Sequence, residues 1–151
     1  YGLKLVGLLA ASGMLRLEKG YLSGKEYNET INPYEAGVGW SVKLDTDFIG
    51  RDALAEIKKN GPAKKLMGFI LNEKDKVAVG GEHIFANDEA VGKITAATFS
   101  PILDESLGLA YVNIANAVPG TEISVVVDGQ SISGKLCAKA MYDPECKRLK
   151  A

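Results

Sequence analysis

The second half of the chain reads as a series of short β-strands, and no other pattern in the sequence constrains the fold as strongly. Apolar and polar residues alternate in short runs, and turn-forming residues separate one run from the next. Asn87-Asp88 and Asp128-Gly129 are compact hairpin signals, because these residue types tolerate positive φ angles. We expect strands over residues 65–71, 83–86, 90–98, 108–114, 122–127 and 130–140. Strands of this length at this spacing predict a small antiparallel barrel or sandwich.

The residues before this series have helical patterns instead. Apolar residues recur at three- and four-residue steps from Leu8 to Leu15, which predicts a helix over residues 7–18. Gly20 then supplies a residue suited to a left-handed helix end. A second helix is expected over residues 51–59.

Two further features organise the first part of the chain. Val38, Trp40 and Val42 alternate with smaller or polar residues, and this period of two predicts a half-buried strand. Gly61-Pro62 stops the second helix and coincides with the change of pattern, so we place a domain boundary there.

Composition excludes several classes of function. The 151 residues are 46% hydrophobic, enough to fill a core, and no apolar run approaches the roughly 20 residues of a membrane span. A formal net charge of −1 gives no field that would attract nucleic acid or an anionic membrane, so neither is an expected partner.

Cys137 and Cys146 lack the spacing of a zinc site, and we expect two free thiols. Because the chain begins with Tyr1, we expect a fragment, a processed product or an excised domain.

Three motifs with unusual residues at fixed spacing precede the strand series. They read Arg-Leu-Glu-Lys-Gly at 16–20, Asn-Pro-Tyr-Glu-Ala-Gly-Val-Gly-Trp at 32–40, and Asp-Phe-Ile-Gly-Arg-Asp-Ala-Leu at 47–54. In this order they resemble the glycine-cleavage T-protein (aminomethyltransferase) superfamily. The strand series is similar to the C-terminal barrel of the same family, through residues 91–95, 99–103, 107–112, 119–121 and 141–144.

The resemblance implies an α+β fold. Residues 1–61 would be the end of a central α/β folate-binding domain, and residues 62–151 a small antiparallel C-terminal β-barrel. The implied function is that of the C-terminal portion of a tetrahydrofolate-dependent aminomethyltransferase of the glycine cleavage system. The implied cofactor is tetrahydrofolate, and the implied partners are the N-terminal part of the same enzyme and a lipoylated carrier protein. The location would be a bacterial cytoplasm or a mitochondrial matrix.

The resemblance also implies where the chemistry lies. The catalytic Asp of the family belongs to the N-terminal domain, so we expect no catalytic residue in this chain and no activity of the chain alone. Two other functions are alternatives. The folate module of a flavin-dependent sarcosine or dimethylglycine oxidising enzyme carries similar motifs. A non-catalytic folate-binding module is less favoured, because such relatives carry a Lys-Gly-Cys signature where this chain has Phe48-Ile49-Gly50-Arg51.

Glu18 is the leading candidate for a folate contact. A carboxylate is poorly placed at a helix C-terminus, which carries partial negative charge, so a functional demand would explain it. By resemblance it binds the pterin ring, since a carboxylate accepts two parallel hydrogen bonds from an amidine-like edge. The alternative is a charge that is solvated or flanked by Lys19. Arg16 faces elsewhere on the helix, and we expect it to pack or to form an ion pair.

Three more residues are candidate folate contacts. Trp40 can stack on a flat heterocycle, although core burial is the favoured interpretation because aromatic residues dominate cores. By resemblance Arg51 meets the carboxylate tail of folate, and pairing with Asp47 or Asp52 is an equal alternative. Tyr142 lies in a segment that folds back toward the folate site in the family, where its phenol would contact the ligand or cap the barrel.

The sequence predicts no metal site. His83 is the only histidine, and a metal site needs three or four donors, so we expect a surface or edge histidine. One histidine without a neighbouring nucleophile also gives no Ser-His-Asp or Cys-His arrangement.

Overall fold

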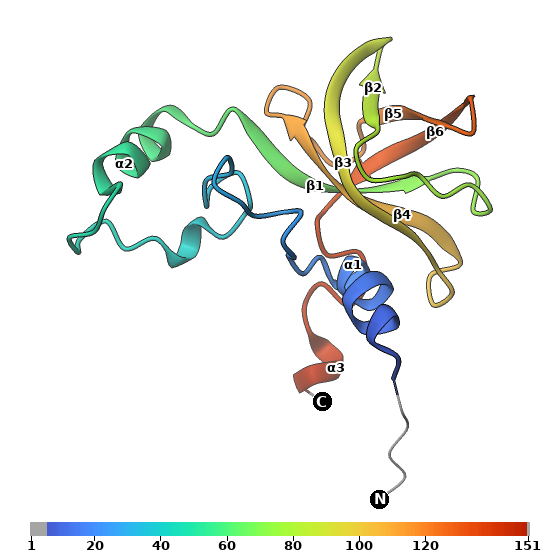
Figure 1. Ribbon diagram of the computed structural model, residues 1–151, viewed down its shortest axis with the longest axis horizontal. Coiled ribbons are helices and arrows are strands. Elements are labelled where there is room, and N and C mark those ends of the chain that lie inside the picture. The colour runs from blue at the N-terminus through green and yellow to red at the C-terminus, as the bar shows by residue number, and fades with distance from the viewer. Residues whose placement is uncertain (1–5, 151) are drawn as a thin grey trace, which may run out of the picture.

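Residues 64–137 form a closed six-stranded antiparallel barrel in the computed structural model, which describes residues 6–150 (Figure 1). Around the barrel the strands follow the order β1-β4-β3-β2-β5-β6, and β1 closes it by pairing with both β4 and β6. The strands are β1 Lys64–Leu71, β2 His83–Ala86, β3 Glu89–Ser100, β4 Glu105–Asn113, β5 Glu122–Val127 and β6 Gln130–Cys137. The predicted barrel is confirmed, and the sandwich alternative is wrong.

The strand boundaries follow the sequence pattern closely. β2 and β5 have the predicted bounds, whereas β3 is longer at both ends and β6 ends at Cys137 rather than at residue 140. The two predicted hairpin turns have positive φ angles at both central residues, 51° and 64° at Asn87-Asp88 and 51° and 76° at Asp128-Gly129. These angles match the twist of the flanking strands, which is why such dipeptides predict hairpins well.

Alternate side chains of every strand fill the interior of the barrel. The buried set includes Met67, Phe69, Ile84, Ile94, Val112, Val125, Ile132 and Leu136. Gly108 gives the ring of Phe69 the space that it occupies. A Cβ at position 108 would lie 2.6 Å from that ring and 2.5 Å from the carbonyl oxygen of Ala96. The close approach of β4 to its neighbours therefore requires glycine at this position.

A helical segment packs on the outside of the barrel. The π-helix η1, Ala10–Leu15, continues into α1, Arg16–Lys19, and Gly20 ends the helix with a φ angle of 70°. The helix predicted over residues 7–18 is confirmed, although its period gave no sign of the wider π-turn. Leu17, on this helix, is buried in a second apolar cluster with the barrel residues Leu66, Leu107, Leu109 and Tyr111.

Residues 32–60, here called the arm, begin against the barrel, where Glu35 and Ala36 are buried, and then extend away from it (Figure 1). The arm contains a 3₁₀ turn, η2 Gly39–Ser41, and the helix α2, Arg51–Asn60. Gly50 precedes α2 with a φ angle of 89°, and Gly61 follows it with a φ angle of 84°. The second predicted helix and its glycine stop are therefore confirmed.

The strand predicted over residues 38–42 is wrong. Gly37 turns the chain with a φ angle of 72°, and residues 39–41 form the η2 turn. The ring of Tyr34 lies against Gly39, where a Cβ would be 2.5 Å from a ring carbon. Alternation over five residues next to two glycines fits a turn as well as a strand, so the period alone could not distinguish them.

After β6 the chain returns past the end of α1 and finishes in a short helix, α3 Lys147–Lys150 (Figure 1). Within residues 6–150, none of the helices has both the length and the apolar character needed to cross a membrane.

Candidate functional site

Glu18 is buried where α1 meets the barrel. Only 2% of its surface is exposed, and the hydroxyl of Ser100, the last residue of β3, donates a 2.5 Å hydrogen bond to its Oε1. Ser100 is also buried, and its oxygen accepts a hydrogen bond of 3.1 Å from the Leu103 amide. Among residues 6–150, no donor to Oε2 of Glu18 is found. The alternative of a solvated charge is therefore wrong.

The C-terminal segment, residues 138–146, crosses the end of the same helix. The amides of Met141 and Tyr142 donate to the carbonyl oxygen of Glu18, at 2.9 and 2.8 Å. Lys19 donates to the carbonyl oxygen of Asp143, and its Nζ lies 3.6 Å from the Asp143 carboxylate. The last carbonyls of a helix have no partner within the helix, so these amides satisfy a group that burial would otherwise leave unpaired.

Lys139 joins this segment to the start of the arm. Its side chain is half-buried, and burial lowers the pKa of its ammonium group. The ammonium lies 3.5 Å from the carbonyl oxygen of Ala36. The Lys139 side chain also covers Gly20, where a Cβ would lie 2.8 Å from the Lys139 Cγ. Sequence reasoning did not single out this lysine.

A second buried carboxylate, Glu26, holds the loop after α1. Arg16 donates to its Oε2 at 2.9 Å, and the amide and hydroxyl of Ser23 donate to the same oxygen at 2.8 and 3.0 Å. The phenol of Tyr111 donates to the backbone carbonyl of Glu26 at 2.5 Å, and burial raises the pKa of that phenol. The expected ion-pair role of Arg16 is confirmed. The spacing Ser23-x-x-Glu26 is that of a capping box, which is the signal that predicts this contact.

The structure brings together two of the four predicted folate residues. Tyr142 lies beside Glu18, to which its amide is bonded. Trp40 and Arg51 lie on the arm, and α2, which carries Arg51, lies well away from α1 (Figure 1). Core burial of Trp40 is wrong, because 84% of its surface is exposed.

Arg51 pairs with Asp52, one of the two aspartates that the sequence offered as partners. Its Nε lies 3.2 Å from a carboxylate oxygen of Asp52, and both side chains are largely exposed. An exposed pair between adjacent residues contributes little to stability, so it does not fix the guanidinium in one position.

The arrangement around Glu18 provides hydrogen-bond acceptors rather than reactive groups. Its carboxylate is enclosed, and Oε2 retains acceptor capacity for a ligand with paired N–H groups. A ligand would reach this carboxylate through a narrow opening or after covering side chains move, because so little of Glu18 is exposed. His83 is exposed on β2, as predicted, and no group of three potential metal ligands occurs within residues 6–150.

Comparison with known proteins gives a consistent result. Residues 64–143 match the family described as the glycine cleavage T-protein C-terminal barrel domain. The chain is 41% identical, over 143 residues, to an aminomethyltransferase of Symbiobacterium thermophilum, covering 89% of this chain and 36% of the relative. It is 44% identical, over 126 residues, to a probable aminomethyltransferase of Haloarcula marismortui, covering 81% of this chain and 35% of that protein.

A solved structure agrees with the sequence matches. The crystal structure of the glycine cleavage system aminomethyltransferase T from Bartonella henselae superposes with a TM-score of 0.82 at 26% identity. The match covers 90% of this chain and 39% of that one. The chain thus spans little more than a third of the length of the relatives that it matches.

Proposed function

Because this chain belongs to the glycine cleavage T-protein family and carries its C-terminal barrel domain, we propose that it is the C-terminal part of a tetrahydrofolate-dependent aminomethyltransferase. The relatives described above bear that name or are called probable aminomethyltransferases, and the one from Symbiobacterium thermophilum is 41% identical. The observation that carries the proposal furthest is the enclosed carboxylate of Glu18, at the junction of the helix and the barrel.

In this proposal Glu18 accepts hydrogen bonds from the N–H edge of the pterin ring. Ser100 occupies one of its oxygens with a single bond and fixes the direction of the carboxylate. A hydrogen bond made to a charged group in a buried, low-dielectric place is stronger than one made in water. The carboxylate therefore has the right chemistry for an amidine-like edge, once its covering side chains give access.

Tyr142 is the second proposed contact, since its backbone is tied to the same helix end. We propose Trp40 and Arg51 as contacts from the arm. The exposed indole has a free face for stacking on a flat ring, and the guanidinium suits the carboxylate tail of a folate. A single folate meets all four residues only if the arm folds toward α1.

The part of the reaction that we assign to this chain is positioning. Transfer of a one-carbon unit to a bound folate depends chiefly on proximity and on stabilisation of charge. We propose that the catalytic Asp belongs to the portion of the relatives that this chain does not match. Most of the contacts with a lipoylated carrier belong to that portion too. The chain alone should then bind folate weakly and be inactive.

Calorimetric titration tests the proposal in the full-length enzyme that contains this sequence. The probe is 5-formyltetrahydrofolate, a stable reduced folate, and the variant is Glu18→Gln, which keeps the shape of the side chain and removes its charge. Hydrogen bonds to charged groups contribute roughly 1.5–3 kcal/mol, so affinity should fall about 10- to 100-fold. Glu122→Gln, at an exposed site on β5, is the control and should bind normally. Unchanged affinity in a folded Glu18→Gln enzyme would refute the assigned role.

A further inference from the structure

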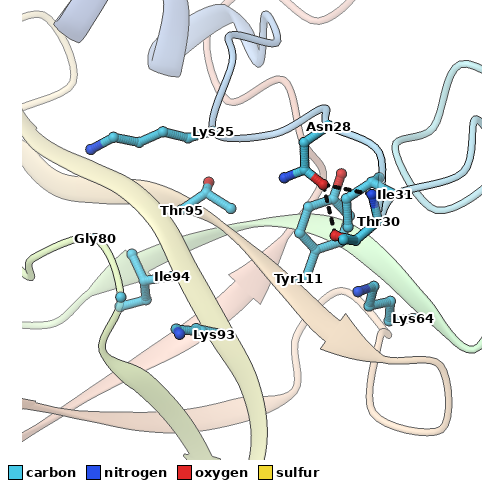
Figure 2. Close-up of a pocket in the computed structure, with 11 residues that line it drawn as sticks. Lys25, Asn28, Thr30, Ile31, Lys64, Gly80, Lys93, Ile94, Thr95 and Tyr111 are labelled. Carbon is cyan, nitrogen blue, oxygen red and sulfur yellow. Dashed lines mark hydrogen bonds between the residues drawn. The ribbon is translucent and has the colours of Figure 1, made fainter.

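A cavity of about 480 Å³ lies between the loop after α1 and one face of the barrel (Figure 2). Three lysines line it from separate parts of the chain: Lys25 from the loop, Lys64 from the start of β1 and Lys93 from β3. Asn28 and Tyr111 contribute polar groups to the same cavity. Its volume falls within the range of small-molecule sites in proteins, roughly 300–1,000 Å³.

This cavity, here called the lysine cavity, has a positively charged lining. No aspartate or glutamate lines it, and none of its three lysines forms an ion pair within residues 6–150. Some other lysines do have partners, as in the pairs Lys74–Asp104 and Lys135–Glu122, and what sets these three apart is that they line one cavity. Like charges that share a cavity repel one another, so a bound anion would stabilise this arrangement.

Two of the carboxylates near the cavity in sequence, Glu26 and Glu82, are engaged elsewhere. Glu26 is fully buried and bonded to Arg16 and Ser23. Glu82 follows the glycine pair of the cavity in sequence, and its carboxylate accepts a hydrogen bond of 2.7 Å from the Val79 amide. Neither carboxylate therefore neutralises the lysines.

Several contacts hold the lining groups in place before any ligand arrives. The ammonium of Lys64 lies 5.4 Å from the ring centroid of Tyr111, a cation–π distance, and the phenol of Tyr111 is anchored to the Glu26 carbonyl. The side-chain oxygen of Asn28 accepts hydrogen bonds from the amide and hydroxyl of Thr30, at 2.9 and 2.7 Å. With that oxygen occupied, the amide nitrogen of Asn28 is the group left to donate to a ligand, and Figure 2 shows it on the side of Lys25.

The floor of the cavity near Lys25 requires a residue without a side chain. A Cβ at Gly80 would lie 2.6 Å from the carbonyl oxygen of Thr95, and 3.7 Å from the ammonium of Lys25. Glycine therefore allows this turn to lie against β3 with the lysine over it.

From these observations we propose that the lysine cavity binds a small polyvalent anion, a molecule that carries two or more carboxylate or phosphate groups. Ammonium groups act as point charges and accept either class of anion, whereas the spread of three of them favours several negative groups on one molecule. None of the four proposed folate residues lines the cavity, so this proposal goes beyond the function proposed above and does not depend on it.

Calorimetric titration of the 151-residue chain with citrate and with pyrophosphate tests the proposal and distinguishes the two classes. Acetate is the monovalent comparison. Binding of citrate or pyrophosphate should saturate at one site and weaken as ionic strength rises, since salt screens exposed charges. Each of Lys25→Gln, Lys64→Gln and Lys93→Gln should weaken it about fivefold, the effect of one charge at contact distance in water. The tighter of the two anions identifies the class.

Lys65→Gln is the matched control. Lys65 is exposed on β1 next to Lys64, so its side chain points to the opposite face of the strand and does not line the cavity. It should leave binding unchanged while lowering the net charge by the same amount. Absence of saturable binding by both anions, or equal weakening by Lys65→Gln, would overturn the proposal. Because all four positions are at the surface or partly exposed, the variants should fold.

Discussion

The hydroxyl of Ser100 donates a 2.5 Å hydrogen bond to the carboxylate of Glu18, across 82 residues of sequence. The bond joins the last residue of β3 to the end of α1 in a place that solvent scarcely reaches. Replacing Ser100 with alanine should leave Oε1 of Glu18 buried without a donor, which costs about 1–3 kcal/mol of unfolding free energy. Urea denaturation measures the change, and Ser133→Ala, at an exposed site on β6, is the control. A loss for Ser100→Ala no larger than that of the control would show that the bond is not stabilising.

The ion pair between Arg16 and Glu26 should matter far more than an exposed pair. Glu26 is fully buried, so replacing Arg16 with methionine would leave a buried charge without its partner, at a cost of about 3–5 kcal/mol. Lys135→Met breaks the exposed pair with Glu122 and should cost at most about 1 kcal/mol. Both values follow from chemical denaturation at neutral pH. Similar losses for the two variants would mean that the loop around Glu26 opens to water.

Gly108→Ala should destabilise the barrel. The added Cβ would lie 2.5 Å from the Ala96 carbonyl and 2.6 Å from the Phe69 ring, so backbone and core must both shift. Overpacking of this kind costs about 1–3 kcal/mol, and thermal unfolding should report a lower Tm. At Gly24 nothing lies within 4 Å of an added Cβ, so Gly24→Ala is the matched control and should change Tm little. An unchanged Tm for Gly108→Ala would contradict the packing described for β4.

Cys137 should contribute a stability that is lost at high pH. Burial, and then the charge of Glu105, raises the pKa of its thiol from 9.0 to about 11. Between these values the unfolded chain loses the thiol proton while the folded chain keeps it, so the folded state is favoured less as pH rises through this window. The contribution is complete below pH 9.0 and disappears above about pH 11.

The measurement compares two proteins that both carry Cys146→Ser, one with Cys137 and one with Cys137→Ala. Cys137 is then the only thiol that can titrate. The free energy of unfolding should fall more steeply with pH in the chain that retains Cys137. The comparison is needed because burial also raises the pKa of Tyr111, which acts in the same direction. Parallel pH profiles for the two proteins would exclude a buried, neutral thiol at position 137.

Trp40 should behave as a water-exposed indole in the 151-residue chain. It is the only tryptophan, and 84% of its surface is exposed, so acrylamide should quench nearly all of the tryptophan fluorescence. If Trp40 contacts folate as proposed, 5-formyltetrahydrofolate should protect it from acrylamide in the full-length enzyme. Equal quenching with and without the folate would remove Trp40 from the proposed site.

The strands of the barrel were predictable from sequence because local signals define them, although these signals fitted a sandwich equally well. Alternation of apolar residues and dipeptides such as Asp128-Gly129 specify strands and turns without reference to distant residues. The strand predicted around Trp40 failed for the complementary reason, since packing of Tyr34 on Gly39 decides that turn and no local period reports it.

The candidate site was predictable only in part. Glu18 stands out because a carboxylate is unfavourable at a helix end, and the ion-pair role of Arg16 followed from its face of the helix. The partner Ser100 lies 82 residues away on another element, and nothing in its own surroundings in the sequence marks it. The three lysines that line the cavity come from segments far apart in the chain, so only the folded structure shows that they share a space.

Closure of the sheet limits how this chain can meet other molecules. Because the strand order closes, with β1 paired to both β4 and β6, every strand of the barrel has a neighbour on each side and none is an edge strand to which an incoming peptide could add along its whole length. Recognition at the barrel must therefore come from side chains and loops, so the identity of individual surface residues, rather than backbone complementarity, decides what it selects.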